Sequence, residues 1–436
     1  MTGPAATGPA ATGPTGAAPV GTGRPEDPSL GSPSLGGPGL ATVLRAALAR
    51  ELAGAVLLRH ELHADAEESG AEHRTAARVA DALGAPDSPV VGGTVVGGTG
   101  RIVRIGPLAG PCVAIRAELD ALPIVEQTGS PWSSRTGAMH ACGHDVHLAA
   151  LVALGRAIRA AQRSGELAAV LPAGLPAALL AVLQPREEVF PSGARDIAQS
   201  AVFAAQQPRA VVAVHLQPQL PPGTAGAPAG TVNAAADDFE ITVAGAGGHA
   251  GYPHLTADPV LALCQVVLAL QQIVSRRTDP LHAVVVSVGA LQAGQAPNVI
   301  PPTASARGTL RALDESDRPG LHKALHEIVE HVSRAHGCQG SVRIDEGEPA
   351  LVNDDALAAA SWPRLRAAGF ALDTSFRSCG ADDFSFYARC APTLMIFVGT
   401  GGPVGLHHPE FLPPDDTVGQ VGAAMLAGYL AALDVL

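Results

Sequence analysis

Hydrophobic residues recur at spacings of three and four from residue 40 to residue 83, and this periodicity predicts helical structure that ends at Gly84. Short β-rich segments interrupted by glycines follow, and a helical pattern then precedes further strand-like segments. The predicted strands are 93–106, 111–122, 179–185 and 209–218, with helices at 147–162 and between the last two strands. Strands that alternate with helices favour an α/β fold with a parallel or mixed sheet.

The pattern changes after about residue 230. The predicted elements are then a strand at 237–247, a helix at 258–274, strands at 282–291 and 303–313, a helix at 317–337 and a strand at 340–347. This βαββαβ order is typical of a small α+β, ferredoxin-like domain with an antiparallel sheet. We therefore predict an α+β domain at 233–345, inserted into a larger α/β domain formed by 39–232 and 346–436.

Composition narrows the class of protein. Hydrophobic residues make up 47% of the 436 residues and charged residues 16%, so most of the chain can bury a core, and two domains are expected. Only residues 1–38, which repeat ATGP and are rich in Gly and Pro, are typical of a disordered tail. The net charge of −12, without any run of Lys or Arg, argues against nucleic acid and anionic membranes as partners.

The sequence gives no sign of export or of a membrane span. The apolar segment 167–183 is broken by a glycine and two prolines, and the first residues lack the basic and apolar regions of a secretory signal. The six cysteines are scattered over a long chain, unlike those of a disulfide framework. We therefore expect a cytoplasmic protein.

The segment MHACGHDVH, residues 139–147, concentrates three histidines, a cysteine and an aspartate. Cys142 and His144 lie two residues apart before a helix, a spacing that a turn can bring to one point although a helical face cannot. Cysteine and histidine together suit Zn²⁺ and related metals. Two other interpretations stay open: a reactive Cys142 thiol whose pKa is lowered by His144, and a buried cysteine among solvated histidines.

Three further candidate positions follow strand-like segments. Glu187 and Glu188 are adjacent carboxylates at the end of an apolar strand, where ligands of open α/β sheets collect. His215 ends a β-branched run, and His407 and His408 follow a glycine-rich loop after a strand. Taken singly, each is equally typical of a solvated loop or of a core histidine with satisfied hydrogen bonds.

The shared position of these residues is more informative than any one of them. All lie at the C-terminal ends of apolar strands, so one edge of one sheet can gather them. Their number exceeds what one tetrahedral zinc requires, and this indicates two metal ions about 3.5–4 Å apart. A thiol nucleophile would not need the distant Glu188, His215 and His407.

A glycine-rich segment of the predicted inserted domain, GAGGHAGYPH, carries His249 and His254 after a strand. Its glycines allow backbone and imidazole to approach a ligand closely. A mobile loop without a role fits the segment equally well.

Together these residues resemble the amidohydrolase branch of the dinuclear metallopeptidases, which are related to aminoacylase and glutamate carboxypeptidase. That branch includes hippurate hydrolases, indole-acetyl-amino-acid hydrolases and N-acetyl-diaminopimelate deacetylases. The likeness covers roughly residues 42–432. The motifs that carry it are LRHELHADAEESGAEHRTA, RAELDALPI, MHACGHDVHLAALVALG, LQPREEVFPSGAR, VHLQP, GAGGHAGYPHLTADPV, APNVIP, GTLRALD, GADDFSFYA and GLHHPEF.

The resemblance implies a zinc-peptidase-like α/β catalytic domain with two divalent ions, for which zinc, manganese, cobalt and nickel are all suitable. The implied metal ligands are Cys142, His144, Glu188, His215 and His407, with Cys142 as a bridging thiolate. The implied general base is Glu187, and Asp120 and Asp145 would support the ligands.

The resemblance also implies a homodimer. His249 would reach into the active site of the partner subunit, which makes residues 233–345 a dimerisation domain. Asn298, Arg311 and His254 would bind the substrate, a small N-acyl amino acid. Three positions depart from the family pattern: Glu118 stands where aspartate is more usual, Asp382 where glutamate is, and His408 where a small residue is common.

The predicted reaction is hydrolysis of the amide that joins an acyl group to an amino acid. Glu187 would take the proton of a metal-bridging water that attacks the carbonyl, and would deliver it to the leaving amine. The second metal and the partner's His249 would stabilise the oxyanion. The alternatives are a carboxypeptidase or dipeptidase on the same dinuclear site, a thiol-dependent enzyme, and a non-catalytic metal-binding relative.

Overall fold

The computed structural model describes residues 38–84 and 94–435. The predicted disordered tail, apart from Pro38, lies outside the described residues. Within the described ranges the largest sheet has eight strands. Their order is β1 (Thr94–Val96), β2 (Gly100–Ile105), β4 (Ala178–Gln184), β3 (Cys112–Glu118), β5 (Pro208–Gln217), β16 (Thr393–Gly399), β6 (Thr224–Gly226) and β15 (Ala371–Asp373). The sheet is mixed, as predicted, because β3, β4, β5 and β16 run parallel while β1, β2 and β6 pair antiparallel.

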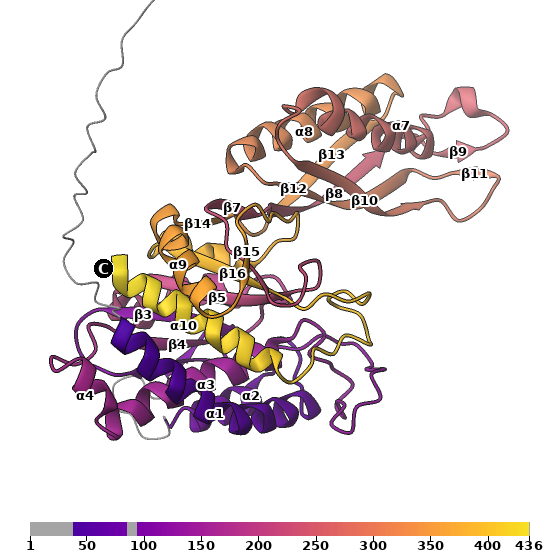
Figure 1. Cartoon of the computed structure of the whole chain (residues 1–436). Helices are drawn as coiled ribbons and strands as arrows, with labels where there is room; N and C mark the ends of the chain where they lie inside the picture. Colours follow the sequence, from indigo (N-terminus) through magenta and orange to yellow (C-terminus); the bar gives the residue numbers. More distant parts are fainter. Residues whose placement is uncertain (1–37, 85–93, 436) are drawn as a thin grey trace, which may run out of the picture. The chain divides into compact units, whose positions relative to one another are not determined.

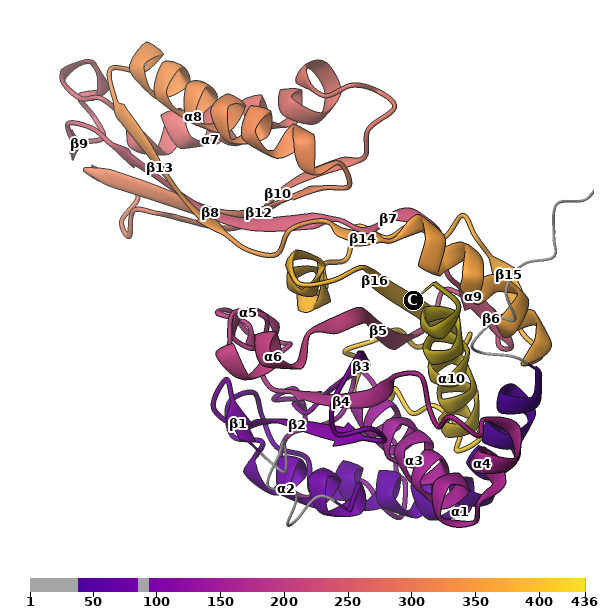
Figure 2. The same cartoon turned by 90° about the vertical axis from the view of Figure 1, so that its left-hand side faces the viewer.

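Helices pack on this sheet (Figures 1 and 2), and a hydrophobic core lies on each of its faces. One core packs α1 (Pro38–Ala64), α3 (His144–Arg163) and α10 (Thr417–Val435) against Val113 and Ile115 of β3. The other packs α5 (Gly193–Ala198) and the 3₁₀ segment Asp383–Arg389 against Ala114. Successive residues of β3 therefore enter opposite cores, as the pleat of a strand requires when both faces are covered.

The N-terminal helical stretch differs from the prediction. Helical structure was predicted over 40–83, and the structure interrupts it between α1 and α2 (His73–Ala82). The residues between them contain Gly70, whose φ of 85° lies in the left-handed region that favours glycine. The side chain of Glu72 accepts a hydrogen bond from the Gly70 N–H. This N–H would donate to a backbone carbonyl if the helix continued, so the side-chain hydrogen bond competes with helix formation here. At the other end, Gly84 does end α2, with a φ of 70°.

A second sheet has four antiparallel strands in the order β10 (Val284–Ala293), β12 (Thr303–Ala312), β8 (Ala235–Ala244) and β13 (Gln339–Glu346) within the described residues. The helices α7 (Pro259–Gln272) and α8 (Arg318–Ala335) pack on one face of it (Figure 2). Phe239, Ile241 and Val243 alternate along β8 and enter that core. The βαββαβ order matches the prediction, while the limits 233–345 and a role in dimerisation stay predictions.

The remaining described elements are short or flank these sheets. They include the helices α4 (Glu166–Val170), α6 (Ala201–Gln206) and α9 (Asp355–Ala367) and the strand pairs β7 (Gly230–Asn233) with β14 (Leu351–Asn353) and β9 (Gly248–His249) with β11 (Val299–Ile300). Two described segments, Pro259–Arg277 and Thr417–Val435, are long and apolar enough to span a membrane by length and composition alone. The second has 72% of its apolar window buried, as in a core helix.

Candidate metal centre and active site

The turn before α3 brings Cys142 and His144 to the same side of the chain. Gly143 between them adopts a φ of 83°, and a Cβ at this position would lie 2.6 Å from Cδ1 of Leu216. The conformation therefore favours glycine, and a larger residue would also require the Leu216 side chain to move. α3 begins at His144, three residues earlier than the periodicity predicted, so the imidazole lies in the first helical turn.

The other candidate ligands lie at the same edge of the eight-stranded sheet. Glu187 and Glu188 follow β4, and His215 lies near the C-terminal end of β5. Both strands run parallel to β3, so their C-terminal ends meet at one edge. The sequence pattern predicted this convergence.

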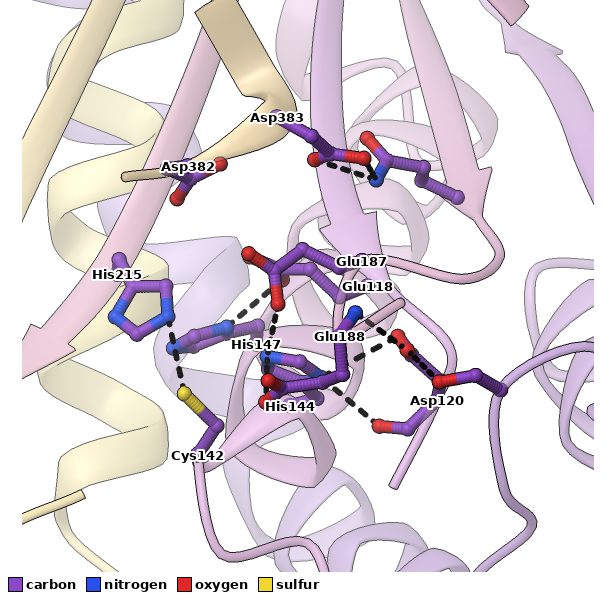
Figure 3. A network of polar contacts seen from close by, with 12 residues as sticks. Glu118, Asp120, Cys142, His144, His147, Glu187, Glu188, His215, Asp382 and Asp383 are labelled. Atoms are coloured by element: carbon purple, nitrogen blue, oxygen red, sulfur yellow. Dashed lines mark hydrogen bonds and ion pairs between the residues drawn. The ribbon is translucent and has the colours of Figure 1, made fainter. Parts of the chain in front are cut away.

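The distances within the cluster are short (Figure 3). Sγ of Cys142 lies 3.5 Å from Nε2 of His215. Nε2 of His144 lies 3.9 Å from Oε2 of Glu187 and 4.0 Å from Oε1 of Glu188. Ligand atoms of Cys142, His144 and Glu188 all lie within 4.8 Å of one another. These three donors therefore surround a space of the size that a metal ion requires.

The hydrogen bonds of the two buried histidines leave Nε2 of each free to bind a metal. Nδ1 of His144 donates to the backbone carbonyl of Asp120 at 2.8 Å, and Nδ1 of His215 donates to that of Leu216 at 2.7 Å. Such bonds fix the tautomer in which Nε2 carries the lone pair. Nε2 of His144 is buried and has no hydrogen-bond partner among the described residues. Buried polar atoms are normally satisfied, so the residues fit a metal centre.

The pKa values of the buried acidic groups also favour a metal site over a reactive thiol. Burial raises the pKa of the Cys142 thiol well above its usual value, and Glu188 and Glu187 raise it further. Burial and the neighbouring Glu188 also raise the pKa of Glu187. The thiol interpretation requires the opposite, because a nucleophilic cysteine has a lowered pKa. A divalent cation reverses this balance, since a coordinating thiol loses its proton.

His407 and His408 are distinguished by their contacts. Nε2 of His407 lies 3.2 Å from Oε1 of Glu188, whereas Nδ1 of His408 accepts a hydrogen bond from the Glu410 N–H; both histidines are exposed. The backbone of His407 has a φ of 64°, an uncommon conformation for a residue with a side chain. This geometry favours His407 as the ligand.

Of the two predicted supporting aspartates, Asp120 contacts a candidate ligand and Asp145 does not. Oδ2 of Asp120 accepts hydrogen bonds from the Glu188 N–H at 2.9 Å and from Ser69 at 2.7 Å. Asp145 instead pairs with Nε of Arg59 at 3.2 Å and with Nδ1 of His63 at 3.0 Å. Asp145 therefore anchors the start of α3 to α1 and does not touch a ligand side chain in these contacts.

Sequence analysis did not identify Arg116, which is fully buried in β3. It forms ion pairs with Glu118, with Asp382 at 3.2 Å and with Asp383 at 2.6 Å. The two carboxylates that depart from the family pattern, Glu118 and Asp382, thus share one guanidinium. The sequence contained a signal for this cluster, because an arginine within an apolar strand requires buried partners for its charge.

The sequence suggested no role for His147, which lies between Glu118 and the backbone of Leu216. Its Nδ1 donates to Oε2 of Glu118 at 2.9 Å, and its Nε2 accepts the Leu216 N–H at 3.2 Å. Glu118, His144, His147 and His215 form a second set close enough to hold an ion. Because both nitrogens of His147 are already engaged, we favour the set that contains Cys142 and Glu188.

A cavity of about 310 Å³ opens beside the cluster. Its walls include Cys142, Glu187, His407 and, from β12, Arg311. Nη1 of Arg311 donates to the backbone carbonyl of Cys379 at 3.1 Å. The structure therefore brings one predicted substrate-binding residue to the candidate metal ligands.

The predicted catalytic residue His249 and the other predicted substrate-binding residues, Asn298 and His254, gather elsewhere. His249 in β9 pairs with Val299 of β11, next to Asn298, whose carbonyl accepts the Ala250 N–H. The rings of His249 and Tyr252 lie 5.3 Å apart, and Tyr252 contacts His254. None of these residues lines the cavity described above within one chain. Their predicted roles stay predictions.

Comparison with known proteins places this geometry in a family. The family model described as peptidase family M20/M25/M40 matches residues 114–432. The N-acetylcysteine deacetylase of Bacillus subtilis is 34% identical over 340 residues, 78% of this chain and 85% of that protein. The N-acetyldiaminopimelate deacetylase of the same organism is 33% identical over 337 residues, 76% and 86% of the two chains.

The solved structures agree. A dinuclear metal-binding M20-family peptidase from Bacillus subtilis superposes with a TM-score of 0.73 at 28% identity, over 89% of this chain and all of that one. The chain belongs to peptidase family M20/M25/M40 and is a metal-dependent amidohydrolase.

Proposed function

We propose that this amidohydrolase cleaves N-acyl amino acids to a carboxylate and a free amino acid. One observation carries the proposal: Glu187 lies beside a buried set of Cys142, His144 and Glu188 whose donor atoms fit a metal ion. The deacetylase names of the two Bacillus relatives support an acylated amino acid as substrate.

The proposed metal ligands are Cys142, His144, Glu188, His215 and His407. Two divalent ions held by these residues would lower the pKa of a water molecule and polarise the amide carbonyl. Zinc, manganese, cobalt and nickel all suit this mixture of thiolate, imidazole and carboxylate.

Glu187 is the proposed general base. Its Oε2 faces Nε2 of His144 at 3.9 Å, and its side chain lines the cavity. From this position the carboxylate would take the proton of the attacking water and deliver it to the leaving nitrogen. Arg311 lines the same cavity and would bind the carboxylate of the substrate.

We further propose that the active site is completed in a homodimer. His249 would enter the partner's cavity and donate to the carbonyl oxygen as negative charge develops, with Asn298 and His254 beside it. A cytoplasmic location, inferred from the scattered cysteines, stays a prediction.

The test is a substrate panel measured on metal-reconstituted enzyme. It would contain acetyl, benzoyl, indole-acetyl and succinyl amino acids together with dipeptides and C-terminally extended peptides. We expect hydrolysis of N-acyl amino acids and its loss after chelation. Hydrolysis of peptides alone would assign the enzyme to the carboxypeptidases or dipeptidases, and activity that survives chelator but not alkylation would indicate a thiol enzyme.

A further inference from the structure

A second cavity, of about 960 Å³, lies at the edge of the eight-stranded sheet opposite the metal centre. Its lining includes Pro111, directly before β3, and Pro208, which begins β5. The candidate metal ligands and their neighbours lie near the other ends of these strands. β3 runs from Cys112 to Glu118, so the two sites are separated by about 20 Å of extended chain.

Three arginines line this cavity, and none of its fourteen lining residues is acidic. They are Arg104 from β2, Arg209 from β5 and Arg389 from the 3₁₀ segment before β16. Guanidinium groups stay protonated at any physiological pH, so the lining carries three permanent positive charges. In a chain of net charge −12, this is a local reversal of sign.

Arg104 is the buried member of the group, with 8% of its surface exposed. Its Nε donates to the Pro107 carbonyl at 2.7 Å, its Nη2 to the Gly110 carbonyl at 2.7 Å, and its Nη1 to the side chain of Gln206 at 3.1 Å. All three acceptors are neutral, and no carboxylate of the described residues pairs with Arg104. A buried charge is ordinarily paired with an opposite charge, so the guanidinium of Arg104 favours a bound anion in this cavity.

Arg209 and Arg389 are exposed and have no ion pair within the described ranges. The guanidinium of Arg389 lies over the ring of Phe386, 5.7 Å from its centroid, which holds it beside the cavity. The exposed Arg209 and Arg389 and the buried Arg104 together suit a ligand group with several negative charges. Each guanidinium can bind two phosphate oxygens at once.

Apart from Gln206 and Gln207, the rest of the lining is apolar or backbone. Leu108, Phe203 and Pro208, with three alanines, form most of the apolar part, and Leu108 is 68% exposed. The volume is that of sites for drug-sized ligands and far exceeds what one inorganic anion fills. The occupant therefore combines a charged group with an apolar or ring portion.

We propose that this pocket, defined by Arg104, Arg209 and Arg389, binds a small molecule that carries a phosphate group and a ring. The ligand binds at a site distinct from the metal centre, and the inference is independent of the substrate proposed above.

The test is calorimetric titration of the full-length, metal-loaded protein with AMP, with adenosine, inorganic phosphate and succinate as comparison probes. We expect one AMP bound per chain, with adenosine and phosphate at least about tenfold weaker because each lacks one half of the recognition. Binding of succinate as tightly as AMP would overturn the assignment to phosphate.

A pair of double variants locates the site. Arg209→Gln with Arg389→Gln should weaken AMP binding at least about tenfold, since each loses charge-assisted hydrogen bonds. Arg276→Gln with Arg366→Gln removes the same charge from exposed arginines elsewhere and should leave AMP affinity unchanged. Arg104 is left intact, because its hydrogen bonds hold the loop before β3.

Three further results would refute the proposal. The first is the absence of AMP binding at millimolar concentration. The second is equal affinity in the pocket variant and in the wild type. The third is loss of AMP binding in Glu188→Gln, which would mean that AMP binds at the metal centre.

Discussion

Replacing Arg116 with methionine tests the buried ionic cluster behind the metal centre. The substitution keeps an unbranched apolar side chain but leaves Glu118, Asp382 and Asp383 without their shared cation. Removing one partner of a buried ion pair costs about 3–5 kcal/mol of the free energy of unfolding. The matched control is Arg50→Met, which removes an exposed ion pair with Glu166 and should cost about 0–1 kcal/mol.

The loss of stability in Arg116→Met can be obtained independently from the cost of protonating Glu118. Burial opposes its ionisation, but Arg116 lowers the pKa of this carboxyl well below its usual value. Without Arg116, burial dominates, and the carboxylate of Glu118 must take up a proton when the protein folds. For a group that titrates near pH 4.5, this costs about 3.4 kcal/mol at pH 7 and about 0.7 kcal/mol at pH 5. The two estimates at neutral pH agree.

The sign of the pH dependence follows from linkage. In the wild type the lowered pKa keeps Glu118 ionised from pH 8 to pH 5, so its contribution to stability does not change in this range. In Arg116→Met the carboxyl must take up a proton on folding, and the cost of doing so falls as the pH approaches the unfolded pKa. The gap in stability between wild type and Arg116→Met should therefore narrow from pH 8 to pH 5. Urea denaturation of the metal-free proteins, followed by circular dichroism, measures it. A gap below about 1 kcal/mol at pH 8, or one independent of pH, would refute the reasoning.

Three further predictions follow from the site and the second sheet. His407→Ala should lose bound metal and activity while His408→Ala keeps both, as measured by metal analysis and turnover; equal losses would contradict the assignment from the contact with Glu188. His249→Ala should abolish activity without metal loss, and its mixed dimers with a Glu187 variant should regain part of the activity, whereas no regain would argue against sharing between subunits. Asp237→Asn should destabilise the protein by about 3–5 kcal/mol at pH 7. Arg318 and His322 lower the pKa of Asp237 against the effect of burial, so this difference should shrink in urea titrations below about pH 4, and a constant difference would contradict it.

Much of the fold could be predicted because hydrophobic periodicity reports burial directly. Apolar runs such as β4 and β5 marked the parallel strands, and their ends marked where Glu188 and His215 converge. The break between α1 and α2 was missed because it depends on Gly70 and on hydrogen bonds made by acidic side chains, which periodicity does not see.

The candidate site was predictable where its residues follow strands, and less so where they act through one another. Arg116 and His147 were missed because their roles consist of contacts between residues far apart in the sequence. His249 is a different case, since its proposed partner belongs to a second chain. A single subunit cannot complete that contact.

The most direct test of the central claim is Glu187→Gln. The variant keeps the shape of the side chain and all five proposed metal ligands but cannot accept a proton. Metal content and turnover of an N-acyl amino acid should be measured on the same preparation as the wild type. The account predicts unchanged metal content with turnover reduced by about 10²–10⁴-fold. A variant that holds its metals and turns over at nearly the wild-type rate would contradict it.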